Sequence, residues 1–127
     1  MNKISKKQYI HKTYALRNKR KTRNGETKTH TNYSTYLPTE YVEANELNEH
    51  VYIYWDGGLY VTVVQPDGSV PYKKLRVHVV HNRQYFIIPR KFFQVIPEDC
   101  KVLFEYFPGE LDRFSGKPQL SIQLVVD

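Results

Sequence analysis

The sequence predicts a mostly β domain with short helices, preceded by a basic arm that is helical or disordered. Three observations support this prediction. In the run His50–Trp55, for example, Val51, Ile53 and Trp55 alternate with Tyr52 and Tyr54, which is the period of a strand, and a glycine turn follows. Pro38 and Pro89 each follow an apolar run and begin a short segment that can be helical. Residues 1–28 hold ten Lys or Arg and a single acid, in a chain of 127 residues whose net charge is +6.

The basic arm, residues 1–28, carries a net charge of +9, whereas residues 29–127 carry −3. Within the arm, residues 5–21 contain no Gly or Pro, and Ser5 with Gln8 forms a capping pattern, so a basic helix is expected there. Its apolar stripe is thin, and most helical stability comes from packing, so we expect it to become ordered on a partner. We therefore expect that deletion of residues 1–24 leaves the thermal transition of the remaining chain nearly unchanged.

The β-rich domain at residues 29–127 shows strand patterns separated by turn signals. Asp56-Gly57-Gly58 supplies the backbone angles that a hairpin turn needs. The expected elements are, in order, a strand at 27–36, a helix from Pro38 to Leu47, a hairpin of 50–55 and 59–64, strands at 75–80 and 84–88, one or two helical turns at 89–96, and strands at 101–107 and 119–126.

A similar outline occurs twice. A shift of 51 positions places Pro38 on Pro89 and needs no gap as far as Ile53. This repeat predicts one ββαββ unit in each copy, at about 29–64 and 77–126. Two such patterns can also arise by chance. If the repeat holds, six residues should share one core about an approximate two-fold axis: Leu37, Val51, Ile53, Ile88, Val102 and Phe104.

The segments "TYLPTEYVEANEL…VYIYWDGGLYVTV" and, less closely, "FIIPRKFF…VLFEYF" resemble the AbrB-like swapped-hairpin DNA-binding domain. The shared pattern is an apolar strand that ends before a proline, a short helix, and a hairpin across a glycine turn. The resemblance covers most of residues 27–126. It implies two ββαββ units that interlock into one barrel-like body, as a monomeric pseudo-dimer or a homodimer. It also implies DNA contacts by Arg83, Arg90 and Lys91.

The charge distribution favours a nucleic acid as partner, because each Lys or Arg near a phosphate releases a condensed counterion. Together with the resemblance, it predicts a small intracellular DNA-binding protein, a transcriptional regulator in the cytoplasm or on the nucleoid, that prefers duplex DNA. Because Arg83, Arg90 and Lys91 all lie in the second copy, the DNA footprint would be asymmetric. The candidate nucleic-acid-binding residues are Lys6, Lys7, Lys12, Arg17, Lys19, Arg20, Lys21, Arg23, Arg83, Arg90 and Lys91.

Two other functions remain open because of the eleven tyrosines. If Tyr52, Tyr54 and Tyr60 share the outward face of the first hairpin, they can stack on unpaired bases, as in a single-strand or RNA-binding module. The same face can instead form a protein interface, because interfaces bury aromatic side chains readily. A phage or viral factor that binds host machinery would use it in this way.

Other chemistry has little support in the sequence. Cys100 is the only cysteine, and His78 and His81 are three apart on a strand, where side chains face opposite sides. The glycines after Asp56 are not followed by the Lys-Ser/Thr of a phosphate-binding loop. No run approaches the eighteen apolar residues of a membrane span. We therefore expect no catalytic site, no metal, no cofactor and no membrane contact.

Overall fold

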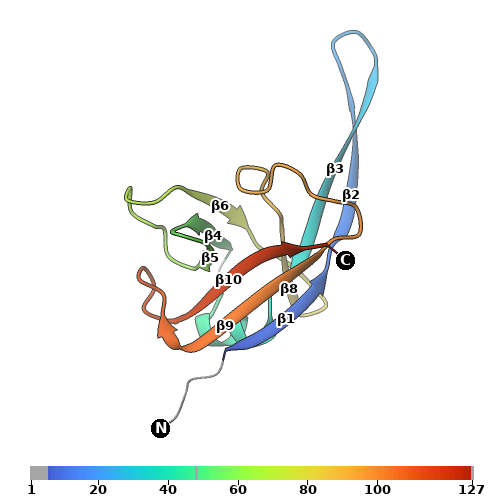
Figure 1. Ribbon diagram of the computed structural model, residues 1–127. Coiled ribbons are helices and arrows are strands. Elements are labelled where there is room, and N and C mark those ends of the chain that lie inside the picture. The colour runs from blue at the N-terminus through green and yellow to red at the C-terminus, as the bar shows by residue number, and fades with distance from the viewer. Residues whose placement is uncertain (1–5, 48, 127) are drawn as a thin grey trace.

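The computed structural model describes residues 6–47 and 49–126, and over these residues the protein is mostly β (Figure 1). This part of the chain contains one short helix, α1 (Thr39–Asn45), and ten strands. The strands are β1 (Lys7–Lys12), β2 (Tyr14–Lys21), β3 (Thr27–Tyr36), β4 (His50–Trp55), β5 (Leu59–Thr62), β6 (Tyr72–Arg76), β7 (His78–Val80), β8 (Arg83–Ile87), β9 (Lys101–Leu111) and β10 (Pro118–Val125).

The strands form two antiparallel sheets that combine the two halves of the chain. One sheet has six strands in the order β1-β9-β10-β5-β4-β6, and the other has four in the order β2-β3-β8-β7. β1, β3, β4 and β5 therefore each pair with a strand that follows residue 71, namely β9, β8, β6 and β10. Both sheets therefore contain strands from both halves of the chain.

One apolar core joins the sheets. Phe86 of β8 and Phe104 of β9 lie in it with ring centroids 6.5 Å apart. Helix α1 adds Tyr41, whose hydroxyl donates a hydrogen bond to the carbonyl of Val61 at 3.2 Å. The shared core predicted from the sequence is confirmed, since this cluster includes Leu37, Val51, Ile53, Ile88, Val102 and Phe104.

The N-terminal segment forms strands, so the helix expected at residues 5–21 is wrong. Ser5 lies outside the described residues, and the rest consists of Lys6, β1, Thr13 and β2. In β1, Tyr9 and His11 are partly buried while Ile10 between them is exposed, which is the period of a strand. The main chain of β1 pairs with β9, and that of β2 with β3, whereas a helix here would have little to pack against. The expected boundary at residues 28/29 lies within β3.

The segment at 89–96, expected to form one or two helical turns, forms a single turn. After Pro89, the amide of Phe93 donates to the carbonyl of Pro89 at 3.3 Å, and no helix follows. The segment contains β-branched Val95 and Ile96 and then Pro97, which disfavours helical geometry in the residue before it. No helix in the described part of the chain is long and apolar enough to cross a membrane.

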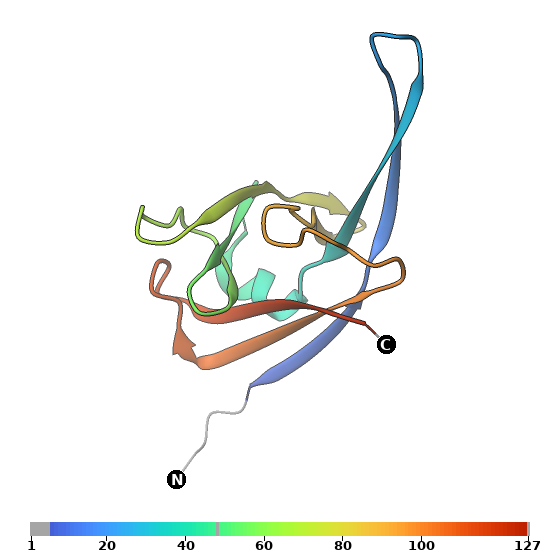
Figure 2. The ribbon, with the colours of Figure 1, turned by 45° about the horizontal axis from the view of Figure 1, so that its top comes forward.

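The most prominent feature is the β2–β3 hairpin, which projects from the body as a narrow ribbon (Figures 1 and 2). The two strands pair from Tyr14↔Ser34 to Lys21↔Thr27. Only residues 34–36 of β3 also pair with β8, so the outer part of the ribbon is two-stranded. At the tip Gly25 has φ +78°, a conformation that favours glycine, and its amide donates to the Thr22 carbonyl at 3.0 Å.

Candidate nucleic-acid interface

The β2–β3 hairpin holds most of the excess positive charge of the protein. Its residues 14–36 include six Lys or Arg and one acid, Glu26, which gives +5 of the total +6. Side chains alternate between the two faces of the ribbon. Arg17, Lys19 and Lys21 share one face, and Arg20 on the other face lies opposite Lys28. Both faces are therefore cationic and, apart from a few positions near the root and tip, exposed.

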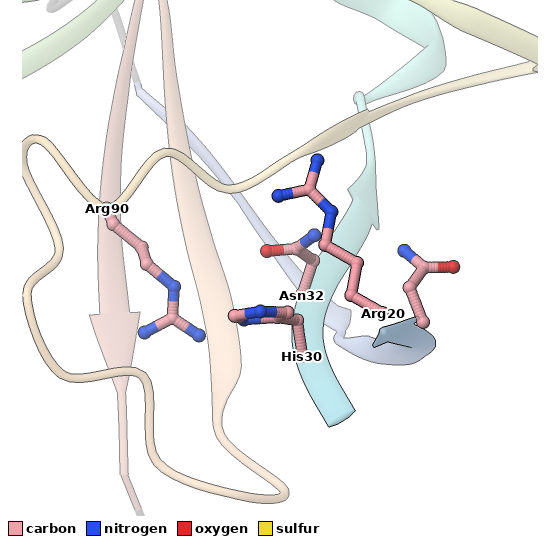
Figure 3. A pocket seen from close by; sticks show the side chains of 5 residues that line it. Arg20, His30, Asn32 and Arg90 are labelled. Atoms are coloured by element: carbon pink, nitrogen blue, oxygen red, sulfur yellow. The ribbon is translucent and has the colours of Figure 1, made fainter. Parts of the chain in front are cut away.

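A polar hollow of about 370 Å³ lies beside this hairpin. We call it the hairpin-root hollow, and its lining residues are Asn18, Arg20, His30, Asn32 and Arg90 (Figure 3). Four of them belong to the ribbon, where Asn18 pairs with His30. Arg90 comes from the loop after β8, and its Nη2 donates to the carbonyl of Thr31 at 2.7 Å.

The three basic residues implied by the family resemblance lie in different places. The Arg83 guanidinium lies 4.0 Å from the centroid of the Tyr36 ring, next to β3, and Arg90 contacts β3 at Thr31. Lys91 instead donates from Nζ to the carbonyl of Tyr72 at 2.9 Å, at the start of β6. Arg83 and Arg90 therefore extend the basic surface of the hairpin onto the body. The Lys91 ammonium is instead hydrogen-bonded within the body.

Lys6, just before β1, and Lys7, its first residue, are paired with acids. Lys6 lies 2.6 Å from Glu105, and Lys7 lies 2.7 Å from Glu40 at the start of α1. These contacts, with hydrogen bonds from Gln8 and Tyr9 respectively, hold the pKa values of both carboxyl groups below their usual range. The bond to Glu40 also raises the pKa of Tyr9 to about 12.

The third predicted basic residue of this region, Lys12, lines a separate hollow together with Thr13, Asp99, Cys100 and Lys101. The remaining predicted residues, Arg17, Lys19, Arg20, Lys21 and Arg23, all lie on the hairpin or in its turn. The structure therefore divides the basic arm between a strand that is part of the body, β1, and a ribbon whose outer part projects from it.

The predicted outward tyrosine face is wrong. Tyr52 is 9% exposed and Tyr54 only 3%, while Tyr60 is half-buried. The loop after β9 covers this side of β4: the Tyr54 hydroxyl donates to Asp112 at 2.9 Å, and the rings of Tyr54 and Phe114 lie 4.9 Å apart. Burial and then the bond to Asp112 raise the pKa of Tyr54. Residues 51–54 of β4 are therefore buried on both faces of the strand.

The more accessible aromatic row lies on the four-stranded sheet. Tyr14 is 46% exposed, and its ring lies 5.7 Å from that of Tyr36. The row continues through Tyr85, 5.8 Å from Tyr36, to His78, which is stacked on Tyr85 at 5.0 Å. It begins at the root of the hairpin, on the strands that carry the basic residues.

The sequence did not predict Asn18, Lys28, His30 and Asn32 as candidate interface residues, because a helical arm would not pair with the strand at 27–36. A local signal for the hairpin does exist. Asn24-Gly25 is a strong turn dipeptide between two segments that can be extended. It would have placed residues 14–21 opposite 27–34 and brought these side chains together.

No protein-family model, curated protein or solved structure matches this chain.

Proposed function

We propose that this protein binds duplex DNA and that the β2–β3 hairpin is its main contact element. The observation that carries the proposal is the hairpin itself, a projecting ribbon with six Lys or Arg and one acid. Phosphate contacts dominate the affinity of proteins for nucleic acids, and a cationic element clear of the body can approach phosphates without a steric clash. Acids on the body neutralise Lys6 and Lys7, which leaves the ribbon as the basic element.

The dimensions of the ribbon suit the major groove. Its ladder extends over eight residues of β2, which at 3.2–3.4 Å per residue is about 26 Å of strand. The major groove, about 12 Å wide, admits a two-stranded β-ribbon. With the ribbon in a groove, Arg83 and Arg90 at its root would face the adjoining backbone.

The side chains of the ribbon favour a duplex over a single strand. Between residues 15 and 32 there is no Phe, Tyr or Trp, whereas single-strand binders use exposed aromatic rings on which bases stack. The specific observation that favours the second candidate, a single-strand or RNA-binding module, is the aromatic row from Tyr14 to His78 on the neighbouring sheet.

We further propose that the body is a tandem of two ββαββ-like units, in the manner of an AbrB-like swapped hairpin within one chain. Two hydrogen bonds support this. The amide of Leu37 donates to the carbonyl of Gln84 at 2.9 Å, and that of Ile88 to the carbonyl of Tyr33 at 2.8 Å. The two donor residues, Leu37 and Ile88, are 51 positions apart in the sequence, and so are the two acceptor residues, Tyr33 and Gln84. If each of β1 to β5 is exchanged with the strand five places later in the chain, β6 to β10, both sheets keep the same strand order, read in the opposite direction.

In such a tandem the hairpin is an asymmetric addition. β2 and β3 have eight and ten residues, whereas their counterparts β7 and β8 have three and five and are joined at His81-Asn82. The DNA footprint would therefore be lopsided, with one ribbon for each chain. A regulator of transcription that acts in the cytoplasm or on the nucleoid fits this arrangement.

Fluorescence anisotropy with labelled duplex DNA, single-stranded DNA and RNA of one sequence, each at two salt concentrations, tests the proposal. The test variant replaces Arg17, Lys19 and Lys21 with Gln, and a matched control replaces Lys73, Lys74 and Arg76, which are exposed on β6. The hairpin variant should bind duplex more weakly and lower the salt slope by up to about 2.7, at 0.9 for each lost phosphate contact. Equal effects of both triple variants would contradict the proposal.

A further inference from the structure

The hairpin-root hollow is lined by donors of hydrogen bonds and contains no acidic side chain (Figure 3). Arg20 and Arg90 provide guanidinium groups, His30 an imidazole, and Asn18 and Asn32 amides. In the figure Arg90 extends toward the hairpin from the loop after β8, whereas Arg20 lies on the hairpin itself. A lining with two guanidinium groups and no carboxylate favours an anion, because a negative group offsets the repulsion between the like charges.

Part of the lining is fixed before any ligand arrives. Arg90 is anchored at one end of its guanidinium by the carbonyl of Thr31, which leaves its other N–H groups available. Asn18 and His30 form a cross-strand pair, and Arg20 and Asn32 lie on the same face of the ribbon. Arg20 forms no ion pair or hydrogen bond with any described residue.

We propose that this hollow binds one phosphate group of the nucleic-acid backbone, with Arg20 and Arg90 as paired donors. Arginine has the planar fork of N–H groups that fits phosphate oxygens, and the imidazole and amides supply further donors to the same tetrahedral group. The assignment rests on the proposed function, since it makes the hollow the point where the backbone is fixed relative to the ribbon. A phosphate contact of this kind positions a protein on its site and carries no sequence information.

The first arm of the test uses inorganic phosphate and requires no DNA. In an NMR titration at constant ionic strength, the Nε–H signals of Arg20 and Arg90 and the amides near His30 should shift saturably, at about 1–10 mM phosphate. Arg20→Gln, which removes no contact within the described protein, should raise the half-saturation concentration about ten-fold or more. Arg76→Gln, on β6, should not change it. Shifts that do not saturate, or that are the same in Arg20→Gln, would overturn the site.

The second arm distinguishes a backbone phosphate from a free one. A set of duplexes is prepared, each with a single neutral methylphosphonate linkage. At one or two positions this linkage should weaken wild-type binding about ten-fold and have no further effect on Arg90→Gln, because the same contact is already lost. If Arg20→Gln and Arg90→Gln bind every duplex as the wild type does, the backbone assignment is wrong even when free phosphate binds. If the wild type binds no duplex, the proposed function fails, and the first arm still decides whether the hollow binds phosphate.

Discussion

Arg90 and Thr31 are 59 residues apart in the chain, and the guanidinium of one donates a 2.7 Å hydrogen bond to the backbone carbonyl of the other. This bond joins the loop after β8 to the hairpin at the point where β3 leaves the sheet, since β3 pairs with β8 only at residues 34–36. It fixes a cation of the body against the root of the ribbon. The proposed interface therefore combines residues from both halves of the chain.

The N-terminal strand should be essential for stability, although the hairpin that follows it should not be. β1 forms six ladder pairs with β9, and Tyr9 packs against the core. Removal of residues 1–12 should therefore lower the free energy of unfolding by several kcal/mol or prevent folding, as measured by urea denaturation. A deletion of similar size, in which residues 17–31 are replaced by an Asn-Gly turn for a net loss of thirteen residues, should leave most of the stability intact. Equal stability of the two deletions would contradict the placement of β1 in the main sheet.

The buried carboxylate of Asp112 should be important for the fold and unimportant for DNA binding. It accepts hydrogen bonds from the hydroxyls of Tyr54, Thr62 and Ser115 and is 2% exposed. Asp112→Ala should lower the free energy of unfolding by about 2–4 kcal/mol, because the buried hydroxyls lose their acceptor. Tyr54→Phe should cost about 1–3 kcal/mol, and Tyr60→Phe, which removes no hydrogen bond within the described part of the chain, should cost little. A large loss of DNA affinity in Tyr54→Phe, with unchanged stability, would argue instead for a binding role.

The contact between β1 and α1 should make stability depend on pH on the acid side. Bonds from Lys7 and then Tyr9 lower the pKa of Glu40 from 4.5. The folded state thus favours the ionised carboxyl, and this stabilisation is present above the unfolded pKa and is lost as pH falls through the lowered one. Between about pH 5 and pH 3, Glu40→Gln should lose less stability than the wild type, by no more than about 1 kcal/mol because the pair is partly exposed. Glu43→Gln on the same helix is the control, and identical pH profiles for wild type and Glu40→Gln would refute the prediction.

The sequence predicted the body of the fold better than the site, for a physical reason. Val51, Ile53 and Phe104 lie on strands whose alternation is visible locally, and they occupy the predicted core. β1 is a strand because β9 pairs with it from far along the chain, and no local pattern shows that partner. The hollow depends on the same kind of contact, since Arg90 reaches the hairpin only in the folded protein.

The aromatic row offers a test of the second candidate function. Tyr14 is the most exposed ring that the row contains, and it stands beside Tyr36 at the hairpin root. If bases stack there, Tyr14→Ser should weaken single-strand binding by about 1–3 kcal/mol. The duplex proposal predicts instead that this change has little effect on duplex affinity. Isothermal titration with both forms of DNA measures the two values, and a strong effect confined to the single strand would favour the second candidate.

The most direct test of the central claim is NMR mapping of the amide signals of the full chain during titration with a short duplex. The hairpin proposal predicts the largest shifts at residues 17–31, with further shifts at Arg83 and Arg90, and all of them reduced at high salt. It predicts small shifts on β4 to β6, on the other sheet. Shifts concentrated on β4 to β6, or none on the ribbon while the duplex binds, would contradict the account.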